Sequence, residues 1–172
     1  MSQASSILNA PFFRELPRRA LAPLPAPLLQ PVLQRIVRAV AARKPELFSR
    51  LGGHSTKTFI IDPLNLPFIF LLSPDPVAPR LRAIRRGRAV QGDCRIAGSF
   101  LNLLDMVDGR LDGDALFFSR DLIIEGDTEA VVVLRNALDD LDSRMPDEIA
   151  AALGRPATIA LKALRRLRAG SR

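Results

Sequence analysis

The spacing of the apolar residues changes at Gly52-Gly53, and this change limits the chain to folds that combine helices with a sheet. Within residues 28–44 the apolar side chains recur every three or four positions, which predicts an amphipathic helix. After the two glycines, residues 56–61 and 67–72 are rich in β-branched and aromatic side chains and flank a turn at Asp62-Pro63. That pattern predicts a β-hairpin.

Further short segments along the chain predict three more strands and four more helices. The strand candidates are residues 80–84, 94–98 and 121–125, and the helix candidates begin at Ser99, Asp127, Met145 and Arg155. An antiparallel meander is the simplest pairing for such strands. We therefore expect an α+β fold in which a five-stranded, mostly antiparallel sheet is covered by helices.

The prolines divide the chain of 172 residues into three parts. Seven of the 14 prolines precede residue 46, and they exclude regular structure from much of the N-terminal region because each one removes a backbone donor. We interpret residues 1–27 as a proline-rich arm, residues 28–153 as one domain with a sizeable core, and residues 154–172 as a basic amphipathic C-terminal helix.

Few residues are available for catalysis or for holding a metal. A single cysteine, Cys94, and a single histidine, His54, exclude a disulfide framework and a structural zinc site. The glycines at 52–53 superficially resemble a phosphate loop, but the glycine directly before Lys57 is missing and a strand follows. We find no acid/base constellation, so we expect a protein that is not an enzyme and binds no cofactor.

No apolar run reaches the length of a membrane-spanning helix, and the densest one, residues 68–72, stops at Ser73-Pro74. We also find no signal-peptide pattern at the N-terminus, and we expect a cytoplasmic protein.

The net charge of +7 is unevenly distributed. Residues 99–148 hold 4 basic and 13 acidic side chains, whereas the flanking regions are strongly basic. Segregation of this kind predicts oriented docking onto an anionic surface. Nucleic acid is the less favoured partner, because the phenylalanines lie away from the basic residues. The candidates for contact with an anionic membrane are Arg35, Arg38, Lys162, Arg165, Arg166 and Arg168.

A motif in the C-terminal half resembles a known family. It runs through Leu116-Phe117-Phe118, Leu122, Ile124-Glu125-Gly126-Asp127-Thr128-Glu129 and Asn136. In this combination the chain is similar to the sterol-carrier-protein-like family (SCP2 domain), and within it to the UbiT branch of bacterial ubiquinone biosynthesis factors. The resemblance covers about residues 28–153.

The resemblance implies a fold and a role. The fold is a five-stranded, mostly antiparallel sheet whose covering helices enclose an apolar lipid tunnel. The role is that of a non-enzymatic accessory factor in oxygen-independent ubiquinone biosynthesis, peripheral to the inner membrane. Its implied ligands are isoprenoid quinone intermediates or phospholipids, and its implied partners are UbiU and UbiV. One departure is the proline-rich segment 73–79, which stands where the family has a short turn.

Burial of a hydrocarbon tail can supply affinity without a polar site, since each buried methylene contributes about 0.8 kcal/mol. A strand with apolar residues on both faces, such as 68–72, needs a helix, a partner or a ligand on each face. The candidate tunnel residues are Phe59, Ile61, Phe68, Phe70, Leu72, Phe100, Leu103, Leu104, Val107, Phe117, Phe118, Leu122 and Ile124.

Two other functions are compatible with the sequence. The chain could be a scaffold with a solid core, whose arm and basic helix recruit other proteins. It could also be an RNA-binding module, which the pI of 11.1 permits. An ordinary buried strand without a cavity is the simplest alternative to the tunnel.

Overall fold

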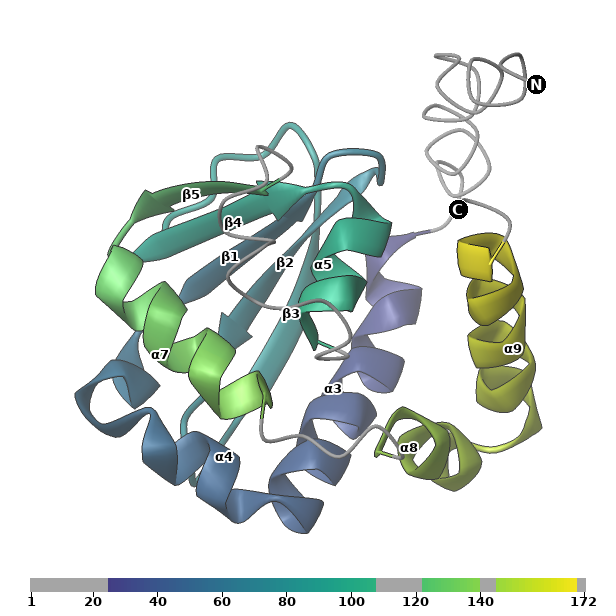
Figure 1. Ribbon diagram of the computed structural model, residues 1–172. Coiled ribbons are helices and arrows are strands. Elements are labelled where there is room, and N and C mark those ends of the chain that lie inside the picture. The colour runs from purple at the N-terminus through teal and green to yellow at the C-terminus, as the bar shows by residue number, and fades with distance from the viewer. Residues whose placement is uncertain (1–24, 108–121, 140–144, 170–172) are drawn as a thin grey trace, which may run out of the picture.

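The computed structural model describes residues 25–107, 122–139 and 145–169, and Figure 1 shows helices gathered on one side of a sheet. The chain begins with the long helix α3 (Ala26–Arg43), the short helix α4 (Pro45–Arg50) and a 3-10 turn, η1 (Gly52–Thr56). The later helices are α5 (Phe100–Val107), α7 (Thr128–Asp139), α8 (Met145–Leu153) and α9 (Arg155–Ala169). The helices expected from the spacing of apolar residues are thereby confirmed.

The sheet is five-stranded, with the order β3-β2-β1-β4-β5. Its strands are β1 (Phe59–Pro63), β2 (Phe68–Ser73), β3 (Arg80–Arg85), β4 (Cys94–Gly98) and β5 (Leu122–Gly126). Three of the pairings are antiparallel, but β4 lies parallel to β1. The expectation of a mostly antiparallel sheet is confirmed, whereas the simple meander is wrong after β3.

The parallel pairing requires the chain to return from the end of β3 to the start of β4, and residues 86–93 make this crossing. They pass over the sheet face that the helices leave open. Gly92 lies so close to Ile60 that an added Cβ would come within 2.7 Å of its Cγ1 atom. At the far end the Asp93 amide donates to the Thr58 carbonyl at 2.9 Å. Residues 86–93 therefore cover part of the sheet face on which no described helix packs.

The main core lies between the sheet and the helices. The side chains of Phe59 and Ile96 are completely buried at its centre, on the neighbouring strands β1 and β4. Val37 of α3, Phe48 of α4 and Leu134 of α7 pack against this centre. Several helices therefore cover one face of the sheet with apolar contacts. The candidate site lies on this helix-covered face.

Side-chain caps fix the starts of two helices, as the sequence predicts. The Ser99 hydroxyl accepts from the Asn102 amide at 3.1 Å ahead of α5, and an Asp127 carboxylate oxygen accepts from the Ala130 amide at 2.9 Å ahead of α7. Each cap satisfies a backbone donor that the first helical turn leaves free.

Candidate functional site

The strand residues proposed for a tunnel share one face of the sheet. Register sets Phe59 opposite Leu72, Ile61 opposite Phe70, and Ile96 opposite Ile124. Alternation along each strand extends the same face to the remaining members of the set. The seven strand candidates on the helix-covered face are Phe59, Ile61, Phe68, Phe70, Leu72, Leu122 and Ile124.

These residues are not all equally covered by the helices. Phe59 and Phe68 are fully buried, so they belong to the closed part of the interior. The side chains of Ile61, Phe70 and Leu72 are only half-buried although they lie on the same face, and the same holds for Leu122 and Ile124. A half-buried apolar surface beneath a layer of helices can take up the hydrocarbon part of a ligand.

Helix α5 forms one border of this surface. Leu103 is buried in the core, whereas Phe100 and Leu104 are half-buried. The other helical candidates cannot be placed in the same way. The side chain of Val107, and the whole of Phe117 and Phe118, lie outside the described residues.

Strand β3 and the second half of α3 add residues that the sequence analysis missed. Leu81 pairs with Leu72 and Ala83 with Phe70, so both extend the helix-covered face. Val40 and Ala41 of α3 are partly buried apolar residues against the same core. The alternation Arg80-Leu81-Arg82-Ala83 is the sequence signal for these two strand residues, although two of its four side chains are basic.

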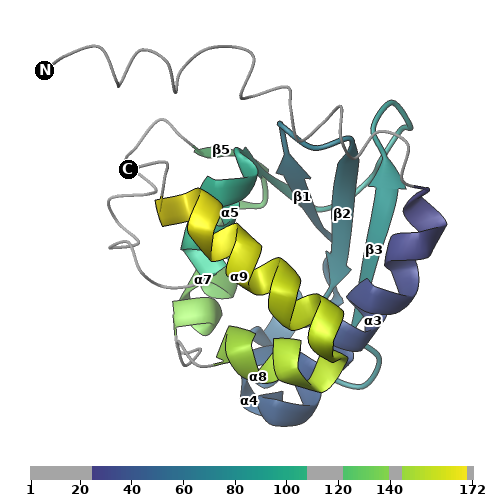
Figure 2. The same cartoon turned by 90° about the vertical axis from the view of Figure 1, so that its right-hand side faces the viewer.

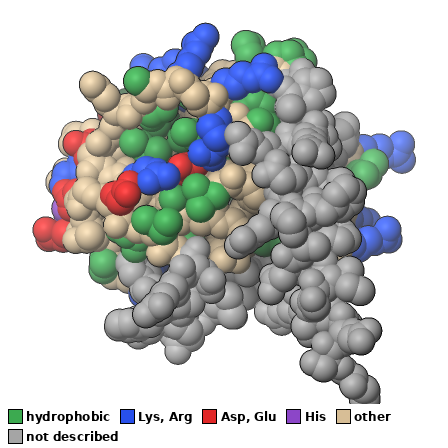
Figure 3. All heavy atoms as spheres, turned by 90° about the horizontal axis from the view of Figure 1, so that it is seen from above, with side chains coloured by type: hydrophobic (Ala, Val, Ile, Leu, Met, Phe, Trp, Pro, Cys, Tyr) green, Lys and Arg blue, Asp and Glu red, His purple; other side chains and the backbone are tan. Residues whose placement is uncertain are grey.

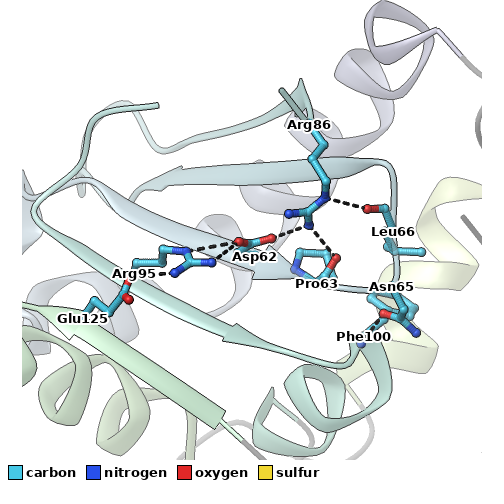
Figure 4. Close-up of polar contacts among 8 residues, drawn as sticks. All are labelled: Asp62, Pro63, Asn65, Leu66, Arg86, Arg95, Phe100 and Glu125. Atoms are coloured by element: carbon cyan, nitrogen blue, oxygen red, sulfur yellow. Dashed lines mark hydrogen bonds and ion pairs between the residues drawn. The ribbon is translucent and has the colours of Figure 1, made fainter. Parts of the chain in front are cut away.

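The opposite face of the sheet carries a network of charged side chains (Figure 4). Asp62 of β1 is 2% exposed and accepts from Arg86, which follows β3, and from Arg95 of β4 at 2.5 Å. Arg95 also donates to Glu125 of β5 at 2.6 Å. Figure 3 shows basic and acidic side chains next to one another among hydrophobic ones, as this network requires.

Burial by itself would raise the pKa of Asp62, but hydrogen bonds from Arg86 and Arg95 outweigh this effect and lower the pKa below its usual range. Arg86 further donates to the carbonyls of Leu66 at 3.2 Å and Pro63 at 2.9 Å. The acid is therefore fully paired and ionised at neutral pH. We interpret the network as the device that fixes the crossing segment and β4 to β1.

The thiol of Cys94 lacks the properties of a catalytic nucleophile. This thiol is 2% exposed, and burial raises its pKa to about 11. It therefore behaves as a small buried hydrophobe. Within the parts of the chain that are described, no group of three or more histidine, cysteine or acidic side chains could hold a metal ion.

The proposed membrane-surface residues lie on two helices. Arg35 and Arg38 are exposed on α3, and Lys162 and Arg166 are exposed on α9. Arg165 is instead held by Asp147 of α8 through two hydrogen bonds of 2.6 and 2.8 Å. The side chain of Arg168 lies outside the described residues.

Helix α9 is joined to the rest of the molecule mainly through α8. Helix α8 packs on α9 and also contacts α3, and Figure 2 shows α9 passing in front of the helical layer. The pair formed by Arg165 and Asp147 therefore orients α9. Among the described helices, none has the length and hydropathy needed to cross a bilayer.

The chain is similar to several proteins of known structure. Among solved structures, the chain is similar to the "UbiJ-SCP2 Ubiquinone synthesis protein", with 19% identity, 68% of this chain and 90% of that chain covered, and a TM-score of 0.48. It is also similar to sterol carrier protein 2 from Yarrowia lipolytica in its apo form, with 11% identity, 62% and 86% coverage, and a TM-score of 0.45.

A third similar structure is the sterol carrier protein domain 2 of Helicoverpa armigera, with 14% identity, 64% and 85% coverage, and a TM-score of 0.43. The curated proteins contain no significant match to this sequence. The model of the SCP-2 sterol transfer family matches residues 33–139, which is more than half of the chain. The chain therefore belongs to the SCP-2 sterol transfer family.

Proposed function

We propose that the protein binds the hydrocarbon part of a lipid against the helix-covered face of its sheet. The observation that carries this proposal is the half-buried state of Ile61, Phe70 and Leu72, which lie side by side beneath the helices. Covering these side chains with an alkyl or isoprenoid tail removes apolar surface from water, at about 25 cal/mol for each Å². Membership in a sterol transfer family supports a ligand of this class.

Within that class, we propose a polyprenylated intermediate of ubiquinone biosynthesis, with a phospholipid tail as the other candidate. The resemblance of residues 114–136 to the UbiT branch supports this choice. The proposed role is that of a non-enzymatic accessory factor in the oxygen-independent route of ubiquinone biosynthesis. Its proposed partners are UbiU and UbiV. The full pairing of Asp62 and the burial of Cys94 agree with a binding role.

We further propose that the protein works at the inner face of the membrane, as a cytoplasmic protein on its surface. The exposed Arg35, Arg38, Lys162 and Arg166 support this, since each basic residue near an anionic surface contributes about 1 kcal/mol. The proposed division into a proline-rich arm (1–27), a lipid-binding domain (28–153) and a basic helix (154–172) is consistent with these basic residues lying on α3 and α9.

Strand β2 offers a matched pair of variants for testing the lipid site. Leu71 and Leu72 are adjacent, identical and both half-buried, yet they point to opposite faces of the sheet. We expect L72Q to lose most of the lipid that co-purifies with the wild type, as measured by native mass spectrometry, because a polar amide then meets the tail. We expect L71Q to retain it.

Two results of this experiment would contradict the proposal. Equal lipid content in L72Q and L71Q would place the ligand elsewhere. Protein that is free of lipid after gentle purification and that also fails to bind added polyprenylated quinone precursors would contradict the function itself. Circular dichroism of both variants provides the control for folding.

A further inference from the structure

The turn between β2 and β3 holds an apolar side chain out into solvent. Val77 is 93% exposed and lies within the sequence Pro74-Asp75-Pro76-Val77-Ala78-Pro79. One Asp75 carboxylate oxygen accepts from the Val77 amide at 2.7 Å and from the Ala78 amide at 3.0 Å. Hydrogen bonding to these two amides lowers the pKa of Asp75, so the carboxylate stays ionised and the turn stays closed at neutral pH.

A second contact fixes this turn against α3. Gln34 donates through Nε2 to the carbonyl of Pro79 at 2.8 Å. Arg38 lies one helical turn further along α3 on the same side, and it is exposed. The turn is thus closed internally by Asp75 and attached to α3 at Pro79.

Basic side chains also flank the turn on the strand that follows it. Arg80 and Arg82 are exposed and point to the same sheet face by alternation. Arg80 directly follows the turn, Arg82 lies two residues further along β3, and Arg38 lies on the helix that Gln34 joins to the turn. An exposed valine on a turn between a strand and a helix that both carry exposed arginines matches an anionic bilayer, where the valine enters the apolar layer and the guanidinium groups meet phosphate.

The base of the turn reaches the proposed lipid site. Leu72 and Leu81 pair directly at the ends of the two strands that the turn connects, and both are half-buried on the helix-covered face. A single exposed valine is common on protein surfaces and would carry no weight alone. Here it stands on a turn that is hydrogen-bonded to α3, between two elements that carry exposed arginines, and close to the end of the apolar face.

We propose that residues 74–79 form a membrane-insertion tip, with Val77 entering an anionic lipid bilayer while Arg38, Arg80 and Arg82 contact its headgroups. This inference rests on the proposed lipid-binding function, because it places the Leu72–Leu81 end of the apolar face against the membrane. A tail leaving the bilayer would then reach the sheet by the shortest route. The proposal adds residues to the membrane surface that the sequence analysis did not include.

The absence of tryptophan and tyrosine from the chain allows a direct test. A V77W protein carries one fluorophore at the tip, and a V132W protein carries one on α7, where Val132 is 43% exposed. Vesicles of phosphatidylglycerol and phosphatidylethanolamine should shift the emission of V77W to shorter wavelength and leave that of V132W unchanged. Vesicles of phosphatidylcholine should shift neither.

A binding measurement complements the fluorescence. We expect V77D to sediment with the anionic vesicles about ten-fold less than wild type, since burying a valine contributes 1.5 kcal/mol or more and 1.4 kcal/mol corresponds to a factor of ten. V132D should bind as the wild type does. Wild-type protein that does not bind the anionic vesicles, or binding that leaves V77W unshifted, would overturn the proposal.

The lipid content of each protein separates this proposal from the proposed function. V77D should keep its co-purified lipid in native mass spectrometry, because residue 77 lies outside the apolar face. Loss of vesicle binding with lipid retained supports the tip. Lipid-free wild-type protein whose V77W variant still shifts would refute the lipid site and leave the tip standing.

Discussion

The side-chain amide of Gln30 on α3 pairs with the backbone of Leu81 on β3 as a neighbouring strand would. Its Nε2 donates to the Leu81 carbonyl at 2.9 Å, and its Oε1 accepts from the Ala83 amide at 3.3 Å. Strand β3 is at the edge of the sheet, so these backbone groups have no strand partner on that side. The helix therefore both covers the sheet and closes its edge.

This contact predicts a measurable loss of stability in Q30L. The substitution leaves a half-buried donor and acceptor without partners, and we expect the free energy of unfolding to fall by about 1–2 kcal/mol. Urea denaturation followed by circular dichroism measures the change. Q91L is the control, because Gln91 is exposed, and its stability should match the wild type. A Q30L protein as stable as Q91L would contradict the role of the contact.

Two glycines with positive φ should respond differently to alanine. Gly126 has φ +82°, and a Cβ there would lie 2.4 Å from the Asp93 carbonyl oxygen, whereas Gly87 has φ +99° and open space around it. We expect G87A to cost about 1–2 kcal/mol through backbone strain alone, and G126A to cost at least about 3 kcal/mol because of the added clash. Thermal denaturation of the two variants tests this order, and equal losses would contradict it.

The local elements of this fold could be predicted because their signals are local. These signals are the spacing of apolar residues in α3 and the capping residues Ser99 and Asp127, and each lies within a few residues of the element that it predicts. In the structure the strand residues proposed for the tunnel share one face, since side chains alternate with period two along each strand.

The parallel pairing of β1 with β4 could not be predicted in this way. In the structure it is accompanied by hydrogen bonds from Arg86 and Arg95 to Asp62, which lie 24 and 33 residues away in the sequence. An isolated aspartate before a proline indicates only a turn, and nothing in its neighbourhood specifies two arginine partners. The sequence also could not predict that the apolar face is half-buried, because this depends on how far α3 and α5 cover the sheet.

The thiol of Cys94 should be unreactive in the folded protein. It is almost fully buried and burial raises its pKa to about 11, so few molecules carry a thiolate at neutral pH. We expect Ellman's reagent to label it at least about 100-fold more slowly in the native protein than in urea. Rapid labelling of the native state would show that the core around β4 opens readily. It would contradict a purely structural role for this cysteine.

Asp62 should make stability depend on pH in the acid range. Its pKa is lowered in the folded protein, where the hydrogen bonds from Arg86 and Arg95 outweigh the effect of burial, and it returns to about 3.9 on unfolding. The unfolded chain therefore binds a proton more readily than the native one. The stabilisation is fully present above about pH 4 and is lost as the pH falls through the lowered pKa.

The D62N variant tests this network directly. At pH 7 it leaves two arginines without their shared carboxylate on the open sheet face, and we expect a loss of about 3 kcal/mol in the free energy of unfolding. The matched variant E125Q removes the exposed partner of Arg95 and should cost less than about 1 kcal/mol. Urea titrations at several pH values should show the gap between D62N and wild type narrowing below pH 4, because the unfolded wild-type chain then binds a proton at Asp62 and the stabilisation is lost as the pH falls through the lowered native pKa. A gap that stays constant with pH, or an E125Q loss equal to that of D62N, would show that the ionised Asp62 does not hold the crossing segment to β1.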